Sequence, residues 1–261
     1  MKNKRAIGLI SAVPLEGSRF VAKLNPEINP FVSCGQKQSL FYSGKHYGCN
    51  LAYVVSGLGK VNAAHAATLL INHFTPSLII NLGVGGAYPS SGLDVGSVAI
   101  ATKEIYADEG VWLKDGLKTL ETIGIPLVQA GRRRYFNEFP LGDRDTKKIM
   151  TLKRMNVWEK NCGFGIRSGA FATVSACTGT KKRAAEIEKR LQVICENMEG
   201  AAVAHICALY GIPLVEIRGI SNMVEERTRE SWDIVNAAEH CQSIVVELLR
   251  EISKTFWVGS V

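Results

Sequence analysis

The sequence predicts an α/β fold, a single domain in which a mixed central β-sheet is flanked by helices on both faces. Short runs rich in β-branched residues alternate with helical patterns, and this alternation is typical of a sheet that helices cover on both sides. The chain has 261 residues, which is long enough for one α/β domain with a large core but not clearly for two. We therefore expect one domain over residues 1–261.

The expected strands are short apolar runs enriched in β-branched residues. In chain order they cover residues 6–13, 51–55, 77–81, 97–101, 192–194 and 213–218. Helical patterns follow at 61–74 and 200–210. Gly59 precedes the first helix, and Gly211 with Pro213 ends the second, as is usual at helix boundaries.

The segment of about 111–164 interrupts this alternation. It joins "GIPLVQAGRRRYFNEFPLGD" to a short basic helix and shows little periodicity, so we expect an insertion or a lid-like excursion within the domain. Its basic part, residues 131–154, includes Arg132, Arg133 and Arg134. These arginines could meet a substrate carboxylate or form a solvated loop.

The charge of the chain argues against nucleic-acid binding. Lys and Arg outnumber Asp and Glu by 31 to 24, which gives a formal net charge of +7. The excess is scattered over 131–135, 147–154 and 181–183, and it forms no aromatic-interleaved basic motif. An anionic small-molecule substrate would still benefit from this field.

Cysteine spacing and the N-terminus bear on the compartment. The seven cysteines include no close C-x-x-C pair, which argues against a disulfide framework and against a zinc site. We expect reduced thiols in a cytoplasm and no metal. The start "MKNKRAIGLISAV" reads as a first strand, because its apolar part is short and lacks a cleavage pattern. No run approaches the roughly 18 apolar residues of a transmembrane helix, so no membrane partner is expected.

Ligands of open α/β sheets gather at the carboxyl ends of strands. Glu16 follows the first expected strand, Glu199 lies near the fifth, and Asn222 follows the sixth, while "SGLGK" and "GVGGA" turns follow the second and third. Each also has a structural explanation, since carboxylates suit helix N-termini, asparagine is a good N-cap and tight turns need glycine. His205 is expected to be a packed or surface residue, because the histidines show no metal-like spacing.

Four stretches together resemble the nucleoside phosphorylase and nucleosidase family, in both order and spacing. They are "ISAVPLE", "VVSGLGKVNAAHAATLL", "IINLGVGGA" and "ENMEGAAVAHICALYGIPLVEIRGIS". The resemblance covers most of residues 5–105 and 165–250, and the middle segment, about 111–164, matches nothing in it. Within the family, "FATVSACTGT" at 171–180 and "GISNMVEERTRESWDI" at 219–234 are most similar to the futalosine hydrolases.

The resemblance implies a role for each matching residue. Glu16 would hold and deprotonate the attacking water, Glu199 would bind the ribose hydroxyls, and Met198 would pack against the sugar. Phe171 would stack on the base, after a one-residue gap in the match. Asn222 takes the base-recognition position that is aspartate in adenine-releasing nucleosidases. The implied catalytic residues are Glu16, Glu199 and Asn222, and the implied substrate-binding residues are Val84, Gly85, Phe171, Met198 and Ser221.

Asn222 indicates a 6-oxopurine base. An ionised aspartate has only acceptors and would repel O6, whereas an amide can donate to O6 and accept from a protonated N7. The amide cannot act as a strong acid, so the group that protonates the purine is not identified. Val84 occupies the place where phosphorylases of this fold carry a hydroxyl, and Glu16 would repel phosphate. Both features favour water as the nucleophile.

The resemblance implies hydrolysis of futalosine to hypoxanthine and dehypoxanthinyl futalosine in menaquinone biosynthesis, with no cofactor. A purine nucleoside phosphorylase, an adenine-releasing methylthioadenosine/adenosylhomocysteine nucleosidase and a non-catalytic nucleoside-binding protein remain the alternatives. Members of the family usually assemble so that a neighbouring subunit closes the pocket, and "YADEGV" at 106–111 lies where that loop would fall. At least a homodimer is therefore implied.

Overall fold

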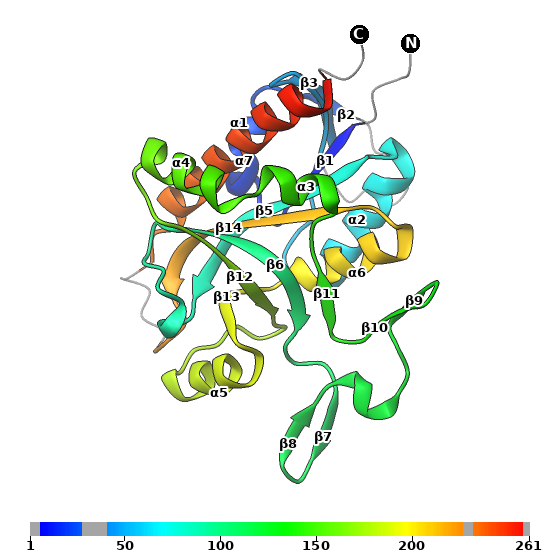
Figure 1. Ribbon diagram of the computed structural model, residues 1–261, viewed down its shortest axis with the longest axis vertical. Coiled ribbons are helices and arrows are strands. Elements are labelled where there is room, and N and C mark those ends of the chain that lie inside the picture. The colour runs from blue at the N-terminus through cyan, green and yellow to red at the C-terminus, as the bar shows by residue number, and fades with distance from the viewer. Residues whose placement is uncertain (1–5, 28–40, 227–231, 258–261) are drawn as a thin grey trace.

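The computed structural model describes residues 6–27, 41–226 and 232–257, and it shows the predicted α/β architecture around one mixed sheet (Figure 1). The sheet has 10 strands in the order β11-β6-β12-β13-β5-β1-β4-β3-β2, with β14 paired to both β5 and β6. These strands are β1 Ile7–Ser11, β2 Asn25–Glu27, β3 Phe41–His46, β4 Cys49–Val55, β5 Leu78–Ala87, β6 Val98–Tyr106, β11 Glu138–Pro140, β12 Ile166–Thr173, β13 Val193–Asn197 and β14 Leu214–Met223.

The strand pairings position the site because they join β5, β14, β6, β12 and β13 into a closed ring. The pairs β14 with β5, β6 with β12 and β12 with β13 are parallel. The pairs β14 with β6 and β13 with β5 are antiparallel. Outside the ring, β1 runs parallel to both β5 and β4. Side chains from distant parts of the sequence are thereby brought to the same end of the sheet.

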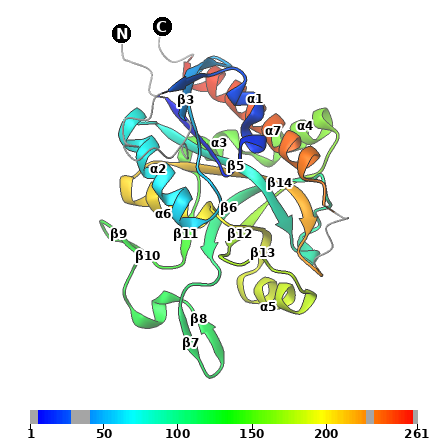
Figure 2. The same cartoon turned by 180° about the vertical axis from the view of Figure 1, so that it is seen from behind.

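Helices cover both faces of the sheet (Figures 1 and 2). The helices are α1 Ser18–Val21, α2 Lys60–Phe74, α3 Arg144–Ile149, α4 Leu152–Cys162, α5 Lys181–Leu191, α6 Gly200–Tyr210 and α7 Ile234–Trp257. None of the described helices combines the length and apolar composition that crossing a membrane requires.

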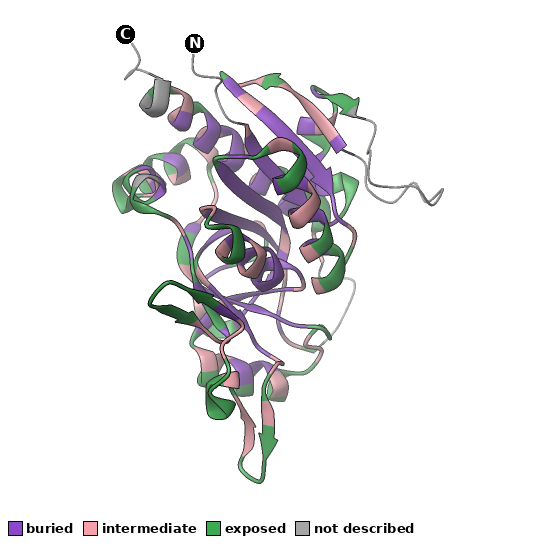
Figure 3. Ribbon diagram, turned by 90° about the vertical axis from the view of Figure 1, so that its right-hand side faces the viewer, coloured by how far each residue is buried: buried purple, intermediate pink, exposed green. Residues whose placement is uncertain are grey.

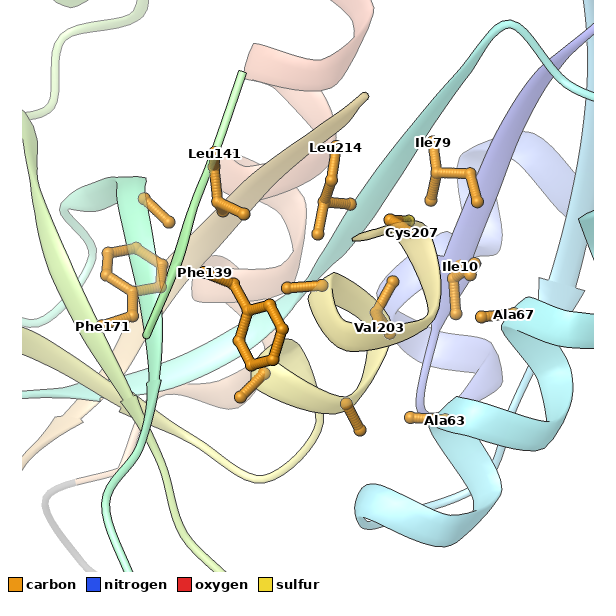
Figure 4. Close-up of a cluster of buried hydrophobic side chains, with 14 of the residues drawn as sticks. Ile10, Ala63, Ala67, Ile79, Phe139, Leu141, Phe171, Val203, Cys207 and Leu214 are labelled. Carbon is orange, nitrogen blue, oxygen red and sulfur yellow. The ribbon is translucent and has the colours of Figure 1, made fainter. Parts of the chain in front are cut away.

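The hydrophobic core is divided by the sheet into clusters. One cluster joins the sheet to α2 and α6 and includes Ile10, Leu70, Val203 and Phe171 (Figure 4). A second cluster joins the sheet to α7 and α4, and a smaller third cluster joins β12 and β13 to α5. Colouring by burial shows the strands between the first two clusters as the most buried part of the described chain (Figure 3). Burial of apolar side chains on both faces stabilises the central strands.

The segment 111–164 has two parts. The first carries the hairpins β7 Val111–Leu113 with β8 Gly116–Lys118 and β9 Val128–Ala130 with β10 Arg133–Tyr135, which extend away from the sheet (Figures 1 and 3). The second part, β11 with α3 and α4, belongs to the main body, since β11 pairs with β6 and both helices contact α7.

The predicted elements are confirmed with shifted boundaries. α6 has the predicted bounds, Gly200–Tyr210, and it ends at Gly211 in the left-handed region at φ 66°. β5 and β14 continue well past the apolar runs that predicted them. The described elements β2, β3, β12, α5 and α7 were not among those predicted.

Candidate active site

Glu16 is held by the backbone at the carboxyl end of β1. It lies in a single 3-10 turn, Pro14–Gly17, and its side chain is 3% exposed. Oε2 accepts hydrogen bonds from the backbone N–H of Ala12 and Val13 at 2.9 and 3.0 Å, and Oε1 accepts from the N–H of Val84 at 2.8 Å. These contacts fix the carboxylate against the glycine-rich end of β5.

The environment of Glu16 suits a general base. Burial raises the pKa of Glu16, and the charge of Arg218 and the backbone N–H groups of Val84 and Val13 offset part of this rise. A carboxylate with a raised pKa is a stronger proton acceptor than an exposed one, and it operates closer to neutral pH.

Glu199 is the first residue before α6, but its side chain does not cap that helix. Oε1 accepts a hydrogen bond from the backbone N–H of Gly59 at 2.9 Å, and Oε2 lies 3.4 Å from Nη1 of Arg218. A carboxylate that served only to stabilise the helix N-terminus through the helix dipole would not explain these contacts. Gly59 lies just before α2 in the SGLGK turn, so this hydrogen bond links the Glu199 carboxylate to that turn.

Arg218 is a buried charged residue of this candidate site that the sequence analysis missed. It is 1% exposed, and Nη1 donates to the backbone oxygen of Val84 at 3.3 Å and faces Glu199. Burial alone would lower the pKa of Arg218, but the carboxylates of Glu216, Glu199 and Glu16 raise it. Arg218 is therefore a fixed cation between the two predicted catalytic carboxylates. The missed signal was a Glu-x-Arg pair inside an apolar strand, because charged residues are almost never fully buried unless paired.

Gly83 leaves the space in which these charges meet. Arg218 and Gly83 are register partners on β14 and β5. An ideal Cβ on Gly83 would lie 2.6 Å from Oε1 of Glu16 and 2.8 Å from Nη1 of Arg218. Any larger residue at this position would displace one of the two.

Asn222 lies within β14, where it does not cap a helix. Its Oδ1 accepts from the hydroxyl of Ser221 at 2.8 Å, and its Nδ2 donates to the backbone oxygen of Met223 at 3.0 Å. Ser221 in turn contacts the backbone oxygen of Gly85 at 3.3 Å. Among the described residues, these contacts use one amide hydrogen and one carbonyl lone pair of Asn222. One donor and one acceptor remain for a ligand.

The structure thus brings most of the predicted site residues together. Hydrogen bonds connect Glu16 to Val84, Ser221 to Gly85 and Ser221 to Asn222, and Arg218 connects Val84 to Glu199.

The remaining two predicted site residues lie differently. Met198 is half-buried next to Glu199, and its Sδ lies 3.3 Å from Sγ of Cys177. Phe171 is not brought to this group, because its side chain is 0% exposed within the hydrophobic cluster of α2 and α6 (Figure 4).

His205 packs on Phe139 at 5.2 Å between ring centroids and faces the hydroxyl of Tyr106 at 3.3 Å, as expected of a packed histidine. Residues 227–231, part of the stretch with the most specific resemblance, lie outside the described residues.

A comparison with protein families decides the membership of the chain. The family model described as the phosphorylase superfamily matches residues 6–256. The chain belongs to the phosphorylase superfamily. Within this family it is 32% identical to the futalosine hydrolase of Thermus thermophilus over 204 residues, which is 78% of this chain and 83% of that protein. It is 27% identical to the 5'-methylthioadenosine/S-adenosylhomocysteine nucleosidase of Maridesulfovibrio salexigens over 251 residues, 94% of this chain and 99% of that protein.

Solved structures of superfamily members share the fold. The 5'-methylthioadenosine/S-adenosylhomocysteine nucleosidase of Neisseria meningitidis, in complex with methylthio-immucillin-A, superposes with a TM-score of 0.76 at 24% identity and covers 95% of this chain and 99% of that chain. The S-adenosylhomocysteine nucleosidase of Streptococcus pyogenes gives 0.77 at 24% identity, with 96% and 98% covered. The prediction of an N-ribosyl hydrolase is confirmed at the level of enzyme class, since these curated relatives are nucleosidases or a nucleoside hydrolase.

Metal and cofactor binding are separate questions. Within the described ranges, no three His, Cys, Asp or Glu side chains are grouped so that they could hold a metal ion. The expectations of no metal and no cofactor stay predictions.

Proposed function

We propose that this superfamily member hydrolyses the N-glycosidic bond of futalosine, releasing hypoxanthine and dehypoxanthinyl futalosine. The observation that carries the proposal is Asn222. Its unused donor and acceptor match O6 and protonated N7 of a 6-oxopurine. Adenine with a protonated N7 presents two donors at the same edge, and the amide oxygen can accept from only one side while the amide nitrogen faces the other donor. The 32% identity to the futalosine hydrolase of Thermus thermophilus supports the same substrate.

In this proposal Glu16 accepts a proton from the attacking water. The water lies between the carboxylate and the ribosyl carbon, and Glu199 binds the ribose hydroxyls while Met198 packs against the sugar. As the bond to the purine breaks, positive charge develops on the sugar, and the carboxylates stabilise this oxocarbenium-like state. Asn222 holds the departing 6-oxopurine through O6 and N7. The electron pair of the broken bond leaves with the base, which takes up a proton from solvent at N7 and so departs as a neutral molecule.

The charge pattern favours water over phosphate as the nucleophile. Arg218, whose charge acts on Glu16, already faces Glu216 and Glu199, so its charge is compensated before any ligand binds. The N–H of Val84 is occupied by Glu16, and the Val84 side chain offers no hydroxyl. Among the residues that the structure describes here, a phosphate dianion would therefore meet carboxylates whose neighbouring cation and backbone N–H are already engaged.

The second candidate is a methylthioadenosine/adenosylhomocysteine nucleosidase. It is favoured by the length of the match, since the relative from Maridesulfovibrio salexigens covers 94% of this chain against 78% for the futalosine hydrolase. The two candidates differ in the base that Asn222 must bind.

Base release distinguishes the candidates. Futalosine, inosine and methylthioadenosine are each incubated with the protein, with and without phosphate, and the free base is identified by chromatography. We expect hypoxanthine from futalosine at a rate independent of phosphate. Adenine from methylthioadenosine alone would favour the second candidate, and phosphate dependence would indicate a phosphorylase. Absence of turnover with all three would indicate a binding protein.

We also propose that the protein forms at least a homodimer and works in a reducing cytoplasm. Exposed large apolar side chains occur at the start of α2, on the β7–β8 hairpin and at the end of α6, for example Val61, Trp112 and Tyr210. Patches of such side chains often mark protein interfaces. In the loop expected to lie there, Asp108 and Glu109 are 2.5 and 3.0 Å from Nζ of Lys60. The six cysteines of the described part form no disulfide with one another, which fits a reducing compartment. Sedimentation velocity tests the oligomeric state.

A further inference from the structure

A second pair of acidic residues lies behind Arg218, between the sheet and the start of α6. Glu104 on β6 and Glu216 on β14 are both 0% exposed. An ideal Cβ on Gly200 would lie 2.1 Å from Oε1 of Glu104 and 2.5 Å from Oε1 of Glu216. Both carboxyl groups therefore occupy the space beside the Cα of Gly200. Buried charges are costly unless they are paired and hydrogen-bonded, so the partners of these two groups need to be identified.

Glu216 holds the guanidinium of Arg218 from the side opposite the site. Its Oε1 accepts from Nε of Arg218 at 3.0 Å and lies 2.9 Å from Nη2. The two residues are two positions apart on β14, so their side chains leave the same face of the strand. With Nε and Nη2 held in this way, Nη1 is directed toward Glu199 and the backbone oxygen of Val84.

Glu104 connects this arrangement to the backbone of Glu199. Its Oε1 accepts from Nδ2 of Asn197 at 2.7 Å, and its Oε2 accepts from the hydroxyl of Thr173 at 2.7 Å. Oδ1 of Asn197 accepts from the backbone N–H of Glu199 at 3.0 Å. Because the Oε1 atoms of Glu104 and Glu216 lie 2.1 and 2.5 Å from the same ideal Cβ position on Gly200, the two carboxyl groups are close neighbours. A path of polar groups therefore leads from the Glu199 carboxylate through Arg218, Glu216, Glu104 and Asn197 back to the backbone of Glu199.

A hydrogen bond between the carboxyl groups of Glu104 and Glu216 requires a proton on one of them. Two ionised carboxylates are both acceptors and cannot hydrogen-bond to each other. Burial raises the pKa of Glu104, and the neighbouring Glu216 raises it further. Burial also raises the pKa of Glu216, but there Arg218 opposes the rise. Glu216 lies directly beside the guanidinium, at 2.9 Å from Nη2 of Arg218, so Glu104 is the better holder of a shared proton.

We propose that neutral Glu104 and ionised Glu216 form a proton-sharing pair that positions Arg218 and Glu199 for catalysis. The proposal rests on the proposed nucleosidase function of the site and adds two positioning residues to it. Neither residue touches the substrate. They act by fixing the guanidinium that sets the distance between the two catalytic carboxylates.

The geometry also explains why position 104 requires an acid. A carboxylic hydroxyl can donate to Glu216 and accept from Asn197 through the same oxygen, whereas an amide nitrogen only donates. In Glu104→Gln, an amide nitrogen facing Glu216 would meet the amide of Asn197, and an amide oxygen facing Glu216 would meet a second acceptor. Either orientation leaves one mismatched contact, although glutamine has the shape and the neutrality of the protonated acid.

The other titratable groups around Glu104 and Glu216 do not replace the shared proton. Among the described residues, the titratable groups that interact electrostatically with the pair include Arg218 on β14, Cys195 on β13, Tyr106 on β6 and Cys207 on α6. Burial raises the pKa of Cys195, Cys207 and Tyr106, so these three stay neutral near pH 8, and Arg218 stays charged.

The test compares the wild type with Glu104→Gln, Glu216→Gln and Leu249→Ala. Leu249 is 0% exposed on α7, in the hydrophobic cluster that joins the sheet to α7 and α4. Leu249→Ala therefore controls for lost stability alone. Infrared spectroscopy in heavy water at pH 8 should show the carbonyl stretch of a neutral carboxylic acid in the wild type, and this band should disappear in Glu104→Gln. For both glutamine variants we expect kcat to fall by about 10- to 100-fold, since small misplacements of catalytic groups cost this much, with KM within about threefold.

Two results would overturn the proposal. One is an infrared band that persists unchanged in Glu104→Gln. The other is a kcat that falls no further than in Leu249→Ala after unfolding curves have matched the variants for stability. Kinetics are measured with whichever nucleoside the wild type cleaves, so a wrong substrate assignment appears in the wild type and is separate from failure of the pair. The infrared result does not depend on any substrate.

Discussion

Replacing Asn222 by aspartate tests the assignment of the base most directly. In the wild type, Nδ2 donates to the backbone oxygen of Met223 at 3.0 Å, and Oδ1 accepts from Ser221 at 2.8 Å. Aspartate keeps the second contact but places an acceptor where the amide donated. The substitution therefore removes the donor to O6 of a 6-oxopurine and supplies an acceptor for a 6-amino group.

The expected magnitude follows from the number of mismatched contacts. One unmatched buried polar contact costs about 1–3 kcal/mol, which corresponds to roughly 5- to 150-fold in kcat/KM. Asn222→Asp should lose this factor with futalosine. With a 6-amino nucleoside the same contact becomes matched, so the ratio of the two kcat/KM values should change by more than either value alone. The contact to the Met223 oxygen is lost in both cases and cancels in the ratio.

The assay measures kcat/KM for futalosine and for methylthioadenosine in the wild type, in Asn222→Asp and in Asn156→Asp. Asn156 is exposed on α4, so Asn156→Asp controls for the added charge and should behave as the wild type does. An Asn222→Asp enzyme that still prefers the hypoxanthine nucleoside by the wild-type ratio would refute the role of Asn222 as the selector.

The other predictions concern the charged centre. Glu16→Gln should lower kcat by about 10²- to 10⁴-fold, the usual contribution of a general base, and equilibrium binding of substrate should persist; unchanged turnover would remove Glu16 from the reaction. In the wild type, kcat/KM should fall as pH falls through the raised pKa of Glu16, above the ordinary range of a glutamate, because the base must be ionised. A limb at the ordinary glutamate value in a pH–rate profile would contradict this. Gly83→Ala should lower stability by about 1–3 kcal/mol, as overpacking does, and should abolish activity, since the added Cβ would lie 2.6 Å from Oε1 of Glu16; urea unfolding and a base-release assay measure the two effects. Glu199→Ala should raise KM and lower kcat, and near-normal kinetics would leave Glu199 as a helix-terminal charge.

The fold could be predicted because local and tertiary signals agree in its central elements. α6 has both a buried face and a glycine stop, so its bounds, Gly200–Tyr210, follow from the sequence. β12 is different, because its residues Arg167, Ser168 and Gly169 interrupt any apolar run. Its strand conformation is set by pairing with β6 and β13, a tertiary effect that overrides local propensity.

The site could be predicted in part for a related reason. Glu16, Glu199 and Asn222 follow strands or interrupt apolar runs, which is where ligand-binding residues are expected. Arg218 was missed because it closes an apolar run and reads as a strand end, while its role depends on partners far away in sequence. Phe171 shows the opposite difficulty, since an aromatic residue near a motif looks the same whether it faces a ligand or, as its 0% exposure shows, the core.

The distribution of charge in the site connects its selectivity to its chemistry. Carboxylates outnumber cations around Arg218, whose neighbours include Glu16, Glu199 and Glu216. At about 4 Å, two like unit charges repel by roughly 4 kcal/mol at the effective dielectric constant near a protein surface, so an incoming phosphate is disfavoured while neutral water is not. The same negative potential stabilises the positive charge that develops on the sugar. Removing one carboxylate should therefore slow hydrolysis and also weaken the exclusion of phosphate. The Glu199→Gln variant, assayed across phosphate concentrations, tests whether the carboxylates exclude phosphate or whether Val84 alone does so. If Val84 alone were responsible, the Glu199→Gln enzyme would be slower but would stay fully independent of phosphate.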